Sequence, residues 1–448
     1  MAIHIKTKLP GPQALKIIER DKKYVSPSYT RDPHCPLVIA SGNGAYVTDV
    51  DGNVFLDFCA GIAVTSTGHS HREVVKSISE QAQKFIHMSG TDFYYDVQSR
   101  LAEKLSALAP GKESKKVFFS NSGAEAIECA LKLARYHTRR KQFIAFFGSF
   151  HGRTYGALSL TSSKPVQKEN FFPFVPGVTH IPYPNMYRAP HGMSENEVGD
   201  RCLDYLKNTV FKTIVPVHEV AAVFMEPIQG EGGYVIPPKK FVKDLIALCR
   251  ENGILLVADE VQSGMGRTGK MFASEHFGVE PDIICLAKGI ASGLPLGATI
   301  ASESIMDWKP GSHASTFGGN PISCAAALTT IDLLEKKYVK NAAEIGKYIL
   351  TKLKKIENKS SFIGNVRGLG LMIGIEIVKD KKTKEPAPLL KAHIVTQAFK
   401  RGLIILGCGV STIRFCPPLV ITKKDADTAL SIFEESLATV EKGTLSSI

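Results

Sequence analysis

Strand-like and helix-like segments alternate along the chain from residue 100 to residue 290. Short apolar runs typical of buried strands recur, and an amphipathic segment, Lys239–Glu251, lies between two of them. The runs are Val117–Phe119, Phe143–Phe147, Ala221–Met225, Ile254–Ala258 and Ile283–Leu286. This alternation predicts an α/β fold with a mostly parallel sheet, because parallel strands are joined by helical crossovers.

The N-terminal part has a different pattern. The segment Ala45–Phe58 is typical of a β-hairpin, because two strand-like runs flank the turn signal Asp51-Gly52. Ser70 and Glu73 have the spacing of a capping box and predict that a helix begins there.

The C-terminal part changes again after residue 330. Helical stretches lead into a glycine-rich strand region at Arg367–Ile377 and a last strand at Ile413–Phe415. We expect a smaller α+β domain that packs with the N-terminal hairpin. The predicted division is an N-terminal segment (1–70) belonging to the small domain, a large domain (71–330) and a C-terminal small domain (331–448).

Composition excludes several classes of protein. At 448 residues, with 44% apolar and 22% charged residues, the chain has ordinary globular values and room for two domains. Its nine cysteines show no metal-ligand spacing, which predicts a reducing compartment and no metal site. The net charge of +12 is spread over helical and loop segments, which indicates a solvated surface rather than a nucleic-acid site. With no apolar run long enough for a membrane span and no signal-peptide core, we expect a cytoplasmic protein.

Two residues at neighbouring strand ends carry the main chemical signal. Asp259 follows one buried run and Lys288 follows the next. In an open parallel sheet, ligands bind outside the carboxyl ends of the strands. An acid and a lysine there suit pyridoxal phosphate, because the lysine can hold the aldehyde as a Schiff base and the carboxylate can keep the pyridine nitrogen protonated. Taken singly, an acid or a lysine at such a position is more often an ordinary turn or surface residue. The interpretation as a cofactor site therefore depends on the other motifs.

A small-residue turn, Ser120 to Glu125, links the strand at Val117–Phe119 to an amphipathic helix. Backbone N–H groups at a helix N-terminus, together with the Ser122 hydroxyl, can hold a phosphate group. The alternative is a plain capping box formed by Ser122 and Glu125.

Two further motifs follow strands. Phe150 or His151 could stack on a pyridine ring, and Arg153 could pair with a substrate carboxylate. Glu226 and Glu231 stand in a glycine-rich loop that could hold the cofactor's face and gate a site. The plainer alternatives are a core aromatic beside a surface arginine, and a polar loop.

Two later residues complete the set. Thr316 lies in a small-residue loop before a helix, which is another possible phosphate contact. Arg414 lies between apolar neighbours on a strand, and a half-buried arginine needs an anionic partner. That partner is either a substrate or Glu231.

In their order and approximate spacing, these motifs resemble the class III, or ω-amino-acid type, aminotransferases of the fold-type I pyridoxal phosphate enzymes. The likeness covers essentially the whole chain and is greatest to 4-aminobutyrate aminotransferases. Acetylornithine and ornithine aminotransferases come next, and some archaeal relatives are amino-acid racemases. One departure is Phe150, where many relatives have Tyr, and stacking survives that change.

The resemblance implies a large domain with a mostly parallel seven-stranded sheet flanked by helices, plus a smaller α+β domain from the N- and C-terminal segments. It also implies a homodimer or a dimer of dimers with shared active sites. The cofactor would be pyridoxal 5′-phosphate, and the partners small amino and oxo acids.

The resemblance implies a role for each matching residue. Lys288 would form the Schiff base and move the proton, and Asp259 would pair with the ring nitrogen. The other cofactor contacts would be Ser122, Gly123 and Ala124 at the phosphate, Thr316 from a neighbouring subunit, Phe150, His151 and Glu226 around the ring, Val261 on the ring face along the same strand as Asp259, and Gln262 at the ring hydroxyl.

Four residues would contact the substrate. Arg153 would bind a carboxylate, and Ile62 would shape the pocket. Glu231 and Arg414 would form a gate: when Glu231 swings away, Arg414 binds the α-carboxylate of glutamate or 2-oxoglutarate. No metal ligand is predicted.

The leading hypothesis is an aminotransferase that moves the amino group of a 4-aminobutyrate-like ω-amino acid to 2-oxoglutarate, giving the semialdehyde and glutamate. The alternatives are an amino-acid racemase on the same scaffold and an acetylornithine or ornithine aminotransferase.

Overall fold

The computed structural model describes residues 2–445, and the expected mostly parallel, seven-stranded sheet is confirmed. The strand order is β4-β10-β9-β8-β7-β5-β6, and β10 alone runs antiparallel to its neighbours. The strands are β4 (Lys115–Ser120), β5 (Gln142–Phe146), β6 (Val178–Ile181), β7 (Val220–Met225), β8 (Leu255–Asp259), β9 (Ile283–Leu286) and β10 (Gly297–Ser302).

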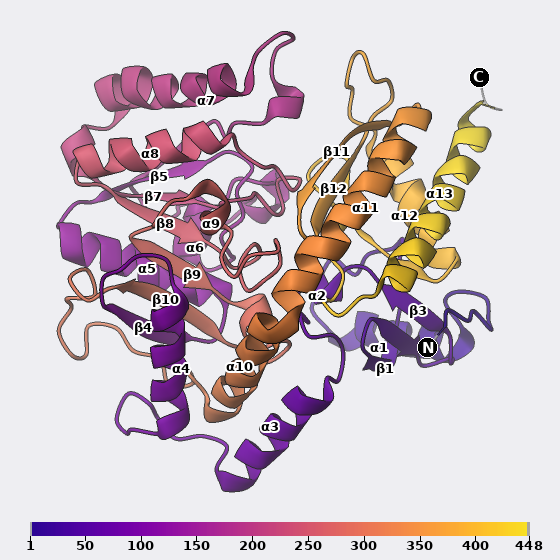
Figure 1. Cartoon of the computed structure of the whole chain (residues 1–448), viewed down its shortest axis with the longest axis horizontal. Helices are drawn as coiled ribbons and strands as arrows, with labels where there is room; N and C mark the ends of the chain where they lie inside the picture. Colours follow the sequence, from indigo (N-terminus) through magenta and orange to yellow (C-terminus); the bar gives the residue numbers. More distant parts are fainter. Residues whose placement is uncertain (1, 446–448) are drawn as a thin grey trace.

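Helices cover both faces of this sheet (Figure 1). Side chains alternate across β7: Val223 and Met225 belong to one apolar cluster, and Ala222 and Phe224 to another. The first cluster includes α7 (Glu195–Asp204) and α8 (Lys239–Glu251), and the second includes α5 (Gly123–Thr138) and α6 (Tyr155–Leu160). Burial on both faces accounts for the almost uninterrupted apolar runs in the sequence.

The predicted hairpin is confirmed as β2 (Tyr46–Asp49) and β3 (Val54–Asp57). Its sheet also contains β1 (Ile39–Asn43) and, parallel to β3, the C-terminal strand β13 (Leu403–Ile404). The N- and C-terminal segments therefore share one small sheet.

The predicted capping box is wrong. The helix α3 (Arg72–Lys84) begins two residues after Ser70, and its N-cap is His71 without a side-chain cap. Ser70 has a φ of +51°, whereas an N-cap residue needs an extended backbone.

A second small sheet, in the order β11-β12-β15-β14, completes the C-terminal part. Its strands are β11 (Ile363–Leu369), β12 (Met372–Ile377), β14 (Leu406–Cys408) and β15 (Thr412–Phe415). A nearly continuous helical stretch leads into it from the large sheet: α10 (Pro321–Leu333), a π-helical segment (Leu334–Tyr338) and α11 (Val339–Lys359). The remaining α-helices of the described residues are α1 (Pro12–Tyr24), α2 (Ala60–Ala63), α4 (Asp96–Leu108), α9 (Ser274–Phe277), α12 (Pro388–Lys400) and α13 (Lys423–Leu445).

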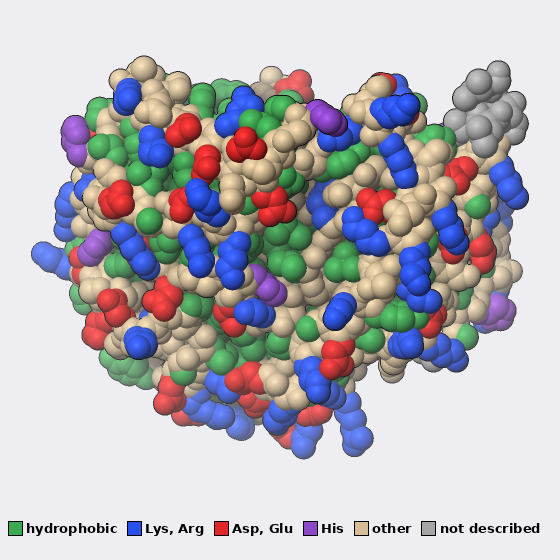
Figure 2. Space-filling model, turned by 45° about the horizontal axis from the view of Figure 1, so that its top comes forward, with side chains coloured by type: hydrophobic (Ala, Val, Ile, Leu, Met, Phe, Trp, Pro, Cys, Tyr) green, Lys and Arg blue, Asp and Glu red, His purple; other side chains and the backbone are tan. Residues whose placement is uncertain are grey.

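The surface intersperses charges of both signs. Figure 2 shows Lys and Arg side chains among Asp and Glu side chains over one face of the molecule. Among the described residues, no helix has the length and apolarity that crossing a membrane would require.

Candidate active site

A cavity of about 420 Å³ lies at the carboxyl edge of the large sheet. We call it the strand-end cavity, and its volume is within the range of small-molecule sites. Its lining includes most of the predicted site residues: Ser122, Gly123, Ala124, Phe150, His151, Arg153, Glu226, Asp259, Val261, Gln262 and Lys288. Ile62, Glu231, Thr316 and Arg414 are not part of this lining.

Asp259 is the last residue of β8 and is buried. Its Oδ2 lies 2.7 Å from Nδ1 of the buried His151, and its Oδ1 accepts the Val261 N–H. Burial alone would lower the pKa of His151, but the hydrogen bond and charge of Asp259, with a smaller contribution from Glu226, raise it. Contact with Asp259 therefore favours the protonated form of His151.

Glu226 is the second buried acid beneath the cavity. It follows β7, and its two carboxylate oxygens accept the N–H groups of Phe150 and Gly230 at 3.1 and 3.0 Å. Burial raises the pKa of Glu226 to about 7. Near neutral pH the Glu226 carboxyl group is therefore partly protonated, whereas an exposed glutamate would be fully ionised.

Lys288 directly follows the β9 region and has a φ of +47°, in the left-handed region. Burial lowers the pKa of its ammonium group, while the charge of Asp259 raises it. A lysine with a lowered pKa supplies more of the neutral amine, which is the form that attacks an aldehyde.

The turn between β4 and α5 contains half of the capping box given as the plainer alternative, because the Glu125 carboxylate accepts the Asn121 N–H and not the Ser122 N–H. Ser122 is the N-cap of α5, and its hydroxyl accepts the Glu125 N–H. Gly123 and Ala124 stand ahead of the first helical hydrogen bonds, so their N–H groups can bind an anion. A Cβ on Gly123 would lie 2.7 Å from a methyl group of Val261, so this close approach requires glycine.

Val261 lies in the cavity wall but not on the predicted element. Because β8 ends at Asp259, Val261 belongs to the turn that follows the strand, and its expected place on the strand is wrong.

Arg414 and Glu231 are brought together across 183 residues of sequence. Nη1 of Arg414, on β15, lies 3.4 Å from Oε2 of Glu231. The other oxygen of Glu231 accepts from Lys164 Nζ at 2.6 Å. Sequence reasoning missed Lys164, because it stands in no motif and meets Glu231 only in the folded chain.

Ile62 lies on a left-handed turn beside Val64, which lines the cavity. All four residues of α2, Ala60 to Ala63, have φ between +48° and +68°. Such a backbone costs roughly 1–2 kcal/mol for each non-glycine residue. The buried Asp57 anchors it: Oδ1 accepts the Cys59 and Ala60 N–H groups, and Oδ2 contacts His69 Nε2 at 2.7 Å.

Thr316 is exposed and lies in the loop between β10 and α10, away from the cavity of its own chain. Its neighbour Phe317 is 61% exposed and contacts the His87 ring at a centroid distance of 5.0 Å.

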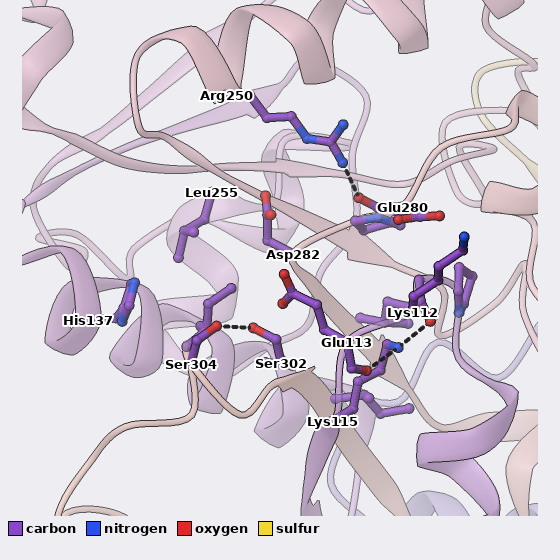
Figure 3. A pocket seen from close by; sticks show the side chains of 17 residues that line it. Lys112, Glu113, Lys115, His137, Arg250, Leu255, Glu280, Asp282, Ser302 and Ser304 are labelled. Atoms are coloured by element: carbon purple, nitrogen blue, oxygen red, sulfur yellow. Dashed lines mark hydrogen bonds between the residues drawn. The ribbon is translucent and has the colours of Figure 1, made fainter.

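A second cavity, of about 470 Å³, lies at the opposite, amino edge of the sheet (Figure 3). Two of its basic side chains have backbone partners: Lys115 Nζ donates to the Gly111 and Glu113 carbonyls, and Arg250 donates to the Glu280 carbonyl. This edge carries none of the predicted site residues, so the strand-end cavity is the candidate active site.

Comparisons with known proteins agree on one family. The sequence profile "Aminotransferase class-III" matches residues 28–437. An alanine/serine racemase of Pyrococcus horikoshii is 45% identical over 440 residues, which cover 97% of this chain and 92% of that protein. A probable 4-aminobutyrate aminotransferase of Bacillus subtilis is 42% identical over 400 residues, which cover 88% of this chain and 92% of that protein. An amine transaminase from an uncultivated Pseudomonas species, solved in its PLP-bound form, superposes with a TM-score of 0.86 at 32% identity, covering 93% of this chain and 99% of that one.

The residues of the strand-end cavity fit pyridoxal phosphate. Gln262 Oε1 is buried without a hydrogen-bond partner, so it is available to a ligand hydroxyl. The α5 N-terminus offers donors to a phosphate, Lys288 offers an amine to an aldehyde, and Asp259 offers a buried carboxylate to a ring nitrogen. These groups match the phosphate, aldehyde, hydroxyl and pyridine nitrogen of one molecule.

Proposed function

We propose that this protein moves the amino group of a 4-aminobutyrate-like ω-amino acid to 2-oxoglutarate. The chain belongs to the class III aminotransferase family, and its cofactor is pyridoxal 5′-phosphate. The products are the semialdehyde and glutamate.

The arrangement of two arginines and one acid carries this proposal. Arg153 lines the cavity, with its guanidinium carbon 5.6 Å from the centroid of the Phe150 ring, and it binds the carboxylate of the ω-amino acid. Arg414 is paired with Glu231 in this state, so Glu231 shields the arginine from the amine-bearing end of the substrate. When Glu231 turns away, Arg414 binds the α-carboxylate of glutamate or 2-oxoglutarate. Two half-reactions with carboxylates in different places need such a switch.

The cofactor-facing residues divide the chemistry. When bound, pyridoxal phosphate supplies a sink for the electron pair left as a C–H bond of the substrate breaks. Lys288 would hold the cofactor's aldehyde carbon and, once displaced by the substrate's amine, would take that proton from the carbon that bears the amino group and deliver it to C4′. Asp259, fixed by His151, keeps the pyridine nitrogen protonated. Gln262 donates to or accepts from the ring hydroxyl, and Phe150 stacks on the ring.

We further propose that Thr316 completes the phosphate site of a second copy of this chain. The exposure of Thr316 and of the apolar Phe317 beside it supports an interface at this loop. Thr316→Ala should weaken cofactor binding without changing the oligomeric state, and light scattering with equilibrium dialysis measures both. A monomer in solution would contradict this assignment.

Product analysis tests the proposed reaction. Holoenzyme with 4-aminobutyrate and 2-oxoglutarate should form semialdehyde and glutamate in equal amounts, and without 2-oxoglutarate the reaction should stop after the first half-reaction, at one semialdehyde per active site. Failure to form glutamate from any ω-amino acid would contradict the proposal.

A racemase is the second candidate, and its support is the 45% identity to the alanine/serine racemase over 97% of this chain. The same Lys288, Asp259 and phosphate site would serve it, with the proton returned to the α-carbon from the other face. Loss of optical activity of alanine or serine without any oxo acid would favour this candidate.

A further inference from the structure

Glu231 contacts two cations at once. Its Oε1 lies 2.6 Å from Lys164 Nζ, whereas its Oε2 lies 3.4 Å from Arg414 Nη1. The contact with Lys164 is short for a charged hydrogen bond, and the contact with Arg414 is at the long limit of one. Glu231 is therefore already held more closely by the lysine than by the arginine.

Arg414 is incompletely satisfied. Its side chain is only 6% exposed, and its Nε is buried without a hydrogen-bond partner. A buried guanidinium needs an anion with good geometry. Arg414 thus keeps donor capacity that Glu231 does not use in this position, whereas a carboxylate in bidentate geometry would take two guanidinium N–H groups.

The backbone around Glu231 is fixed, so only its side chain has to move. The Glu231 carbonyl accepts the Gly409 N–H at 2.7 Å, and the preceding Gly230 N–H is bound to Glu226. Lys164 follows α6 and its side chain is 42% exposed, which leaves it free to follow a small rotation of the carboxylate.

We infer that Lys164 is a positioning residue of the gate: it keeps Glu231 paired when Arg414 is released to bind the α-carboxylate of glutamate or 2-oxoglutarate. This inference rests on the proposed function. Without Lys164, opening would leave the Glu231 carboxylate without a partner, so the closed pair would be favoured.

The expected effect is selective for one substrate class. The apparent affinity of a ligand falls with the fraction of protein in the state that binds it. Lys164→Met should therefore weaken binding of glutamate and 2-oxoglutarate, which need Arg414 released, and spare 4-aminobutyrate, which does not. The loss expected for a partly exposed ion pair is about fivefold.

The test measures both half-reactions of the holoenzyme from its absorbance change, with 4-aminobutyrate alone and with glutamate alone. Lys164→Met should raise the concentration for half-maximal rate about fivefold with glutamate and less than about twofold with 4-aminobutyrate. Lys164→Arg should behave as wild type. Lys391→Met is the matched control: it removes a positive charge from the same region, but the Lys391 ammonium donates to the Val410 carbonyl rather than to Glu231.

A double-mutant cycle separates this role from direct binding of substrate by Lys164. In a Glu231→Ala background, Lys164→Met should have no further effect on glutamate. A loss that persists there, an equal loss with both substrates, no loss, or the same loss from Lys391→Met would each overturn the inference. If the wild type does not react with 4-aminobutyrate, the proposed function itself fails. If the wild type reacts with both substrates and Lys164→Met has the same half-maximal concentrations as the wild type, only the inference about Lys164 fails.

Discussion

Asp259 and His151 are buried and contact each other at 2.7 Å, whereas Glu231 is 19% exposed and divides its carboxylate between two cations. We call the first group, with Glu226 and Lys288, the cofactor side of the site. The second group, with Arg153, Arg414 and Ile62, is the substrate side. Ile62 is 42% exposed, on a strained turn.

Under the proposed function, this difference would let one site keep its chemistry while it accepts two different carboxylic substrates. On the cofactor side Asp259 has a fixed, buried partner in His151 and Glu226 accepts two backbone N–H groups, and electrostatic interactions between such buried groups are strong and hard to rearrange. On the substrate side the acid has an alternative partner within reach, so two arrangements differ little in free energy. Substitutions on the cofactor side should therefore affect every substrate equally, and those on the substrate side should redistribute activity among substrates.

Removal of Lys288 should have the largest effect. Lys288→Ala removes both the anchor of the cofactor and the group that moves the proton, so turnover should fall roughly 10³-fold or more with every substrate. Steady-state rates measure this. The α5 N-terminus remains, so the variant should still bind the cofactor's phosphate, as dialysis would show. Substantial turnover would contradict the assigned role.

Asp259→Asn should rank second, because it breaks a buried charge pair and removes the negative partner of the ring nitrogen. We expect kcat to fall about 10² to 10³-fold, equally with 4-aminobutyrate and glutamate. The matched control is Glu260→Gln, since the neighbouring Glu260 is also buried but accepts the N–H groups of Ala273 and Ser274. A loss confined to one substrate would break the comparison between the two sides.

Glu231→Ala should have a smaller and selective effect. With Arg414 permanently available, kcat/KM should fall about tenfold with 4-aminobutyrate and change little with glutamate. Competition between the two substrates in one vessel gives this ratio directly. Equal losses with both would place Glu231 on the cofactor side.

The smallest effect should be a pH dependence of stability. Burial raises the pKa of Glu260 and of Glu226 to about 7, from an ordinary value of 4.5. Because the folded pKa lies above the unfolded one, their contribution is complete below about pH 4.5 and is lost as the pH rises through about 7. The midpoint temperature of thermal unfolding should therefore fall by about 2–4 °C between pH 6 and pH 8. Glu260→Gln should show a smaller decrease over the same pH range. The same dependence of the unfolding temperature on pH in the wild type and in Glu260→Gln would contradict the raised pKa of Glu260.

The sequence pattern was sufficient for five strands of the large sheet and for the residues that follow them, but it did not predict β6 and β10, and only the family resemblance implied seven strands. The signal is local for Asp259, Lys288 and Ser122: each directly follows a buried run, and parallel strands bring their carboxyl ends to one edge. His151 was placed at that edge, but its hydrogen bond to Asp259, 108 residues away, has no sequence signal.

Contacts on the substrate side could not be predicted in the same way. Lys164 meets Glu231 across 67 residues, and neither its spacing nor its neighbours distinguish it from a surface lysine. The Ser70–Glu73 pattern failed because a left-handed backbone at Ser70 overrides the local cap signal. The Lys164–Glu231 contact and the backbone conformation of Ser70 both depend on tertiary packing, which a short sequence pattern does not contain.

The central claim is that one fixed cofactor side serves two different carboxylic substrates. The most direct measurement is the absorbance of the purified holoenzyme on addition of 4-aminobutyrate alone, followed by 2-oxoglutarate. We predict that the cofactor's band converts to that of the amine form and returns only when 2-oxoglutarate is added. A band that is unchanged by 4-aminobutyrate, while alanine or serine loses optical activity without any oxo acid, would contradict the account.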